Sequence, residues 1–90
     1  MSNSIVEIDV RDLPAPGPLE KVLALLAITP RSDIVCMIHR QHPCSLFSFL
    51  EDRGYSSSVL DKGNLIYIYI WSTENLEAPL IVEGEIKRAR

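Results

Sequence analysis

The spacing of apolar residues divides the chain into alternating strands and helices. Short apolar runs bounded by turn residues, the pattern of β-strands, occur at residues 5–10, 34–40, 55–60 and 65–71. Apolar residues recur every three or four positions in two segments, residues 18–28 and 44–53, which predicts helices. The order β-α-β-α-β-β predicts an α/β (α+β) two-layer sandwich, with a four-stranded mixed sheet and two helices on one face.

The C-terminal part of the chain follows a weaker pattern. We expect residues 1–71 to form the domain and residues 72–90 to be a C-terminal extension. Residues 80–86 carry apolar side chains and are either a further strand or part of a flexible tail that ends in basic residues.

Length, composition and charge restrict the class of protein. The 90 residues are 47% hydrophobic and carry a formal net charge of -3, which fits one small globular domain and argues against a nucleic-acid partner. No apolar run approaches the roughly 20 residues that cross a bilayer, so no membrane partner is expected. Two cysteines and no visible secretory signal fit a reducing compartment, and we expect a cytoplasmic protein without a cofactor.

Two predicted loops should meet at one edge of the sheet. If the first two strands are parallel neighbours, the loop 11–18 and the loop 40–44 lie at the same rim, where both helices begin. Helix N-termini carry partial positive charge, and Arg11 and Arg40 add formal charge, so the rim could hold an anion or a thiolate. The residues of this expected cleft are Arg11, Asp12, Ala15, Pro16, Arg40, His42 and Cys44. Alternatively, the arginines pair with the aspartates of the first loop and bind nothing else.

One cysteine has a position that favours reactivity. Cys44 should begin the second helix, where the helix N-terminus and nearby cations lower a thiol pKa; the alternative is a small apolar residue with no chemical role. Cys36 lies within an apolar strand and is expected in the core. His39, His42 and Cys44 are metal-type ligands at short spacing, but a structural zinc site generally needs a second ligand cluster, so we predict no metal site and no catalytic residues.

An aromatic stripe runs along the last clear strand. Tyr67, Tyr69 and Trp71 alternate with isoleucines, so they should lie on the sheet face opposite the helices. Tyrosine and tryptophan are frequent at interfaces, which predicts a surface for a protein partner or a homodimer on this open face. The alternative is that residues 80–86 fold back and cover the stripe.

The segment from Asp9 to Leu19 resembles the entry loop of the TusA/SirA sulfur-carrier domains. Those domains read Asp-x-Arg-Gly-Leu-x-Cys-Pro-x-Pro before the first helix. The matching positions here are Asp9, Arg11, Asp12, Leu13, Ala15, Pro16 and Pro18. Ala15 stands where the sulfur-accepting cysteine would be. A methyl group cannot carry a persulfide, so the resemblance implies the fold without the usual sulfur relay.

The chain looks still more like a related bacterial family of unknown function. That family shares an Asp-x-Arg-x-Leu-Pro-Pro-x-x-Pro-Leu type of opening and a second helix that ends in Arg-Gly-Tyr, which matches residues 53–55. We therefore expect a non-enzymatic module for protein interaction. The alternatives are a divergent sulfur-transfer or redox carrier that uses Cys44, and a small anion-binding domain.

Overall fold

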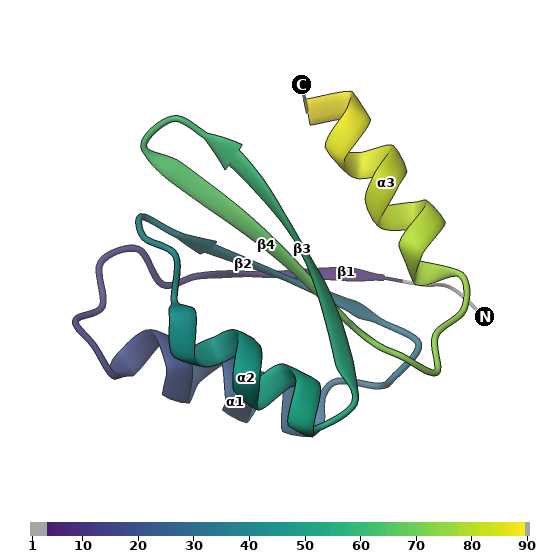
Figure 1. The fold of residues 1–90 in the computed structure, drawn as a ribbon, viewed down its shortest axis with the longest axis horizontal. Helices are drawn as coiled ribbons and strands as arrows, with labels where there is room; N and C mark the ends of the chain where they lie inside the picture. Colours follow the sequence, from purple (N-terminus) through teal and green to yellow (C-terminus); the bar gives the residue numbers. More distant parts are fainter. Residues whose placement is uncertain (1–3, 90) are drawn as a thin grey trace.

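The predicted α+β architecture is confirmed by the computed structural model, which describes residues 4–89 except for the side chain of Cys44. Four strands and three helices follow one another: β1 (Ile5–Asp9), α1 (Gly17–Ile28), β2 (Ile34–His39), α2 (Cys44–Asp52), β3 (Tyr55–Lys62), β4 (Leu65–Ser72) and α3 (Ala78–Ala89). The strands form one sheet in the order β1-β2-β4-β3 (Figure 1). β1 and β2 are parallel, whereas β4 is antiparallel to both of its neighbours.

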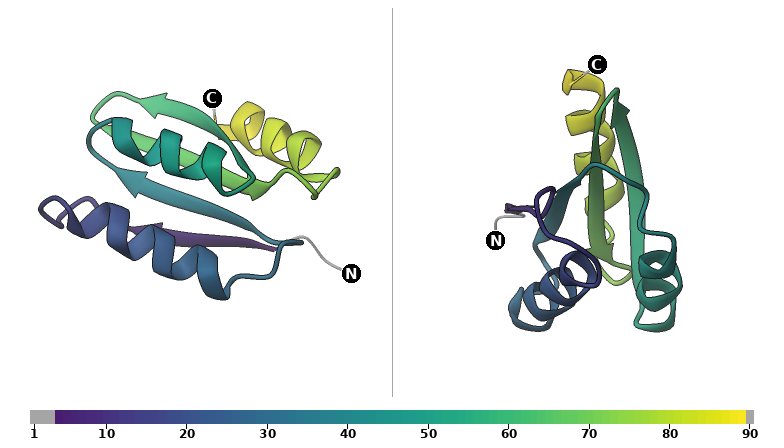
Figure 2. Two further views of the ribbon diagram at one scale, coloured as in Figure 1. Left: turned by 60° about the horizontal axis from the view of Figure 1, so that its bottom comes forward. Right: turned by 90° about the vertical axis from the view of Figure 1, so that its left-hand side faces the viewer.

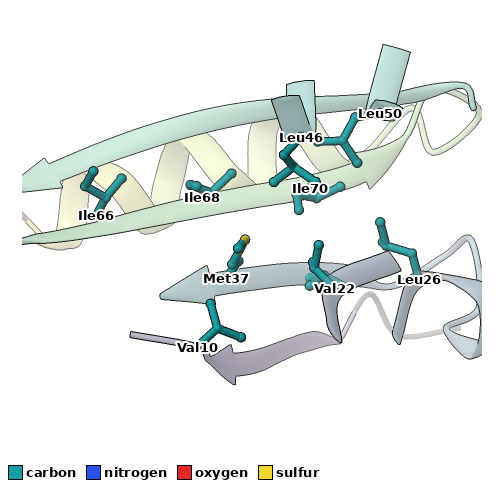
Figure 3. Close-up of a cluster of buried hydrophobic side chains, with 10 residues drawn as sticks. Val10, Val22, Leu26, Met37, Leu46, Leu50, Ile66, Ile68 and Ile70 are labelled. Carbon is teal, nitrogen blue, oxygen red and sulfur yellow. The ribbon is translucent and has the colours of Figure 1, made fainter. Parts of the chain in front are cut away.

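Helices α1 and α2 cover one face of the sheet, and α3 lies on the other (Figure 2). The core under α1 and α2 is aliphatic, because alternate residues of the strands point to this face. Its buried side chains are Val10, Val22, Leu26, Val35, Met37, Leu46, Leu50, Ile66, Ile68 and Ile70. Figure 3 shows these side chains converging from the strands and from both helices.

The C-terminal segment, expected to be a strand or a flexible tail, is helix α3 instead. Pro79 sits in the first helical turn, where a missing N–H costs little. Lys87 and Glu83 form an i,i+4 ion pair of 3.0 Å on the exposed side of the helix. Ala78 and Val82 are buried against the sheet, so α3 adds a layer that the two-layer prediction lacked.

Two glycines close the turns around β3. Gly54 follows α2 with a φ of 79°, and Gly63 opens the β3–β4 turn with a φ of 77°. In this left-handed region a Cβ is strained, which explains glycine at both positions. The β3–β4 turn has two residues, Gly63 and Asn64, and only the first has positive φ, as in a type II′ turn. No helix among residues 4–89 is long and apolar enough to cross a membrane.

Candidate functional site

The loops that follow β1 and β2 lie together at one rim of the sheet. β1 and β2 run parallel in adjacent positions, so their carboxyl ends share an edge. The Val10 N–H donates to the Ile38 carbonyl at 3.0 Å and extends this pairing into the first loop. α1 begins at Gly17 and α2 at Cys44, so both helix N-termini are at this rim, as the sequence predicts.

Arg40 fastens the second loop to the first. Its Nη2 lies 3.1 Å from Asp12 Oδ1, and its Nε donates to the Arg11 carbonyl at 3.3 Å. Both side chains are largely exposed, so the ion pair alone contributes little to stability. Its effect is on geometry, because two contacts from one guanidinium fix the position of the first loop relative to β2.

Arg11 is held by the strand that precedes it. Its Nη2 lies 2.7 Å from Asp9 Oδ2, and its Nε donates to the same carboxylate at 2.9 Å. These hydrogen bonds lower the pKa of Asp9 and raise that of Arg11. Each arginine of the rim is therefore paired with an aspartate, which agrees with the pairing alternative rather than with a cationic cleft.

The tip of the first loop is exposed. Leu13, Pro14, Ala15 and Pro16 all face solvent, and Ala15 and Pro16 are joined by a cis peptide bond. Beside the loop lies a hollow of about 470 Å³, lined by Ile8, Asp9, Val10, Asp12, Leu13 and Lys21. The rim thus offers a mostly apolar tip next to a shallow depression with charged margins.

The structure describes no metal or thiol site formed by His39, His42 and Cys44. The Cys44 backbone starts α2, but its side chain lies outside the described part. His42 is exposed. His39 is half-buried with a buried Nδ1 that has no hydrogen-bond partner, and burial lowers its pKa. Within residues 4–89, no three described His, Cys, Asp or Glu side chains are placed to hold a metal ion.

The expected open sheet face is not open. Tyr69 and Trp71 are buried under α3, and Tyr67 is partly buried at its margin. The prediction that these aromatic residues form an exposed partner or dimer surface is therefore corrected. They supply the apolar floor on which Ala78 and Val82 of α3 pack, which is the alternative in which the C-terminal segment folds back.

A row of polar side chains crosses the face under α3. The strand registers place Glu7 beside Cys36, Cys36 beside Tyr69, and Tyr69 beside Ser58. Burial, with the nearby Glu7 carboxylate, raises the pKa of Cys36 to about 11; burial also raises the pKa of Tyr69 to about 12. Sequence reasoning missed this row because it depends on the strand registers.

Comparison with protein-family models, curated proteins and solved structures finds no match to this chain. The function of the chain is therefore inferred from its residues and from the geometry of the rim.

Proposed function

We propose that this chain is a non-enzymatic protein-interaction module with a TusA-like fold, and that it contacts its partner through residues 11–16. The observation that carries the proposal is the exposed, mostly apolar tip of this loop, held in place by the contacts of Arg40 with Arg11 and Asp12. A loop that is fixed before binding loses little conformational entropy when a partner docks, so its contact area contributes efficiently to affinity.

The chemistry of the loop also favours binding over group transfer. Ala15 occupies the position of the sulfur-accepting cysteine in the resembling domains, and its methyl group has no nucleophile. Leu13 is 36% exposed and lies at the margin of the hollow beside Lys21. An exposed apolar side chain beside a depression offers a partner both apolar surface to cover and a hollow to fill.

Site-specific photocrosslinking in the native cell tests this proposal. A benzophenone side chain at position 13 should give a discrete cross-linked protein. The same group at Asp52, exposed at the far end of α2, should give none. Arg40→Ala should lower the yield at position 13 several-fold, because it releases the loop, and should change the midpoint of urea unfolding only slightly. Equal products from positions 13 and 52, or none, would refute the proposal.

A second candidate function is a sulfur-transfer or redox carrier that uses Cys44. The observation in its favour is that Cys44 is the first residue of α2, which places its backbone at the same rim as residues 11–16. Alkylation at a series of pH values tests it, and Cys36 supplies an internal reference because it is buried and its pKa is about 11. The carrier requires rapid labelling of Cys44 well below pH 8, lost in Cys44→Ala. An ordinary pH profile would exclude it.

A further inference from the structure

Strand β3 presents an uncovered edge of the sheet. It is the outermost strand next to β4, and within residues 4–89 no further strand pairs with it. All eight of its residues pair with β4 in one continuous register, from Tyr55 with Ser72 to Lys62 with Leu65. Proteins usually protect a long edge with a bulge, a proline or charged residues. β3 has no bulge or proline, and its charged residues, Asp61 and Lys62, lie at its end, so its centre of Ser57, Ser58 and Val59 is unprotected.

The register also shows which backbone groups point away from the sheet. In an antiparallel pair, hydrogen-bonded and non-hydrogen-bonded residue pairs alternate. The Thr73 N–H donates to the Gly54 carbonyl at 2.9 Å, which assigns the even-numbered residues of β3 to hydrogen-bonded pairs. The N–H and C=O groups of the odd-numbered residues therefore point outward. These residues are Tyr55, Ser57, Val59 and Asp61.

A hollow flanks this edge on each side of the sheet. On the α2 side, about 330 Å³ is enclosed by Phe47, Leu50, Glu51 and the start of β3. On the α3 side, about 420 Å³ lies between Ser58, Trp71, Val82 and Ile86. Successive side chains of an extended strand point to opposite faces. A strand added beside β3 would therefore direct its side chains alternately into the two hollows.

The lining residues indicate the chemistry of the occupant. The α3-side hollow has Trp71, Val82 and Ile86 as apolar surface, and its Lys87 is already paired with Glu83. The α2-side hollow carries the exposed carboxylate of Glu51. An apolar side chain suits the first hollow and a basic one suits the second. The net charge of -3 of the chain likewise favours a partner segment that carries positive charge.

We propose that the outer edge of β3 binds an extended, basic segment of a partner protein by strand addition, with its apolar side chains toward α3 and its lysines or arginines toward α2. This inference rests on the proposed function as an interaction module and adds a second contact surface to it. Backbone hydrogen bonds supply affinity in this mode, and the alternating pockets supply specificity.

Peptide titration followed by NMR tests the inference on the full chain. The probe is an eight-residue capped peptide that alternates lysine with valine or phenylalanine. We expect its addition to shift the β3 amide signals and to slow hydrogen exchange at the Ser57 and Val59 amides. A control peptide with the lysines replaced by glutamates should bind at least about tenfold more weakly, which corresponds to about 1.4 kcal/mol.

Two further variants separate strand addition from nonspecific contact. Val59→Pro removes an outward N–H while leaving the pairing with β4, and it should weaken binding at least about tenfold; Val59→Thr is the matched control. If Val59→Pro does not fold, a peptide N-methylated at its edge-facing residues makes the same test on the unaltered chain.

Three results would overturn strand addition at β3, and they can be told apart from a failure of the proposed function. No shift on β3 at millimolar peptide, or undiminished binding of the N-methylated peptide, overturns the inference. Dimerisation of the chain with protection of the same amides also overturns it, because the occupant would then be a second copy. Cross-linking at position 13 without peptide binding at β3 would leave the proposed function standing and remove only the edge.

Discussion

The two faces of the sheet are closed in different ways. Under α1 and α2, ten buried side chains form a wholly aliphatic core apart from the thioether of Met37. Under α3, the core has seven buried side chains, among them Cys36, Tyr69 and Trp71, and the described part of α3 contributes two of the seven, Ala78 and Val82. The stability that a core contributes grows with the apolar area that it buries. We therefore expect α1 and α2 to stabilise the fold more than α3 does, and α3 to be the helix that the sheet loses more easily.

Two buried isoleucines, one on each face of the sheet, allow the stability of the two cores to be compared. Ile68 lies under α1 and α2 and Ile34 under α3, and both are fully buried. Ile68→Ala should lower the free energy of unfolding by about 4 kcal/mol, and Ile34→Ala by about 3 kcal/mol, because α3 can move into the space left behind. Urea unfolding measures both, with Ile28→Ala, at an 80% exposed position, as the control. Equal losses would contradict the difference between the faces.

A charge under α3 should detach this helix alone. Val82→Asp places a carboxylate at a position that is 1% exposed, and docking of α3 should weaken by about 3 kcal/mol. Trp71, the single tryptophan, lies beneath α3, so its fluorescence emission should shift to the red while the α1 and α2 signals remain native by NMR. Leu80→Asp, at a 76% exposed position of the same helix, is the matched control. Global unfolding by Val82→Asp would show that α3 is not separable.

Alkaline pH should destabilise the α3 face through two buried groups, Cys36 and Tyr69. The pKa of Cys36 rises from 9.0 to about 11 and that of Tyr69 from 10.0 to about 12 on folding, chiefly through burial. The unfolded chain therefore releases these protons first, so the free energy of unfolding falls as the pH rises from about 9 to about 12. In urea titrations at a series of pH values, Cys36→Ala should reduce the loss of stability at the lower end of this pH range. Tyr69→Phe should reduce it at the upper end. Unchanged slopes in both variants would contradict the burial of the two groups.

A single hydrogen bond from the β3–β4 turn holds the end of α3 and should contribute least to stability. Lys62, at the β3–β4 turn, donates from Nζ to the Ala89 carbonyl at 2.8 Å and places its charge at the C-terminus of the helix. Lys62→Met keeps the aliphatic stem and should cost about 0.5 kcal/mol. Faster hydrogen exchange in the last turn of α3 would measure the loss, with the exposed Lys21→Met as the control. An unaltered exchange rate would show that the contact does not hold the helix end.

The sequence predicted the sheet and the first two helices because each has one clear period. Helix α3 was harder to predict from the sequence, because its apolar residues fit both the period of a strand and that of a helix. Leu80, Val82 and Ile86 alternate as on one face of a strand, whereas Ala78 and Val82 recur at helical spacing. The helix is decided by contacts that the local pattern does not contain, namely the apolar floor of Trp71 and Tyr69 beneath it.

At the rim, the sequence predicted that the two loops lie side by side. It did not decide whether Arg11 and Arg40 bind an anion or pair with aspartates. Proximity followed from the parallel pairing of β1 and β2, which a strand-helix-strand order favours. The pairing of Arg11 with Asp9 and of Arg40 with Asp12 depends on side-chain geometry at distances near 3 Å. The uncovered edge of β3 could not be predicted from the sequence either, because it depends on β4 lying between β2 and β3 in the sheet.

The position of β4 has a consequence for how the chain is completed on the ribosome. Its neighbours β2 and β3 are both synthesised earlier, yet neither can pair with the other, because β4 belongs between them. Until residues 65–72 emerge, β2 can pair only with β1, and β3 has no strand to pair with. The sheet is therefore expected to form only after residues 65–72 have emerged, in one step governed by the arrival of its most apolar strand.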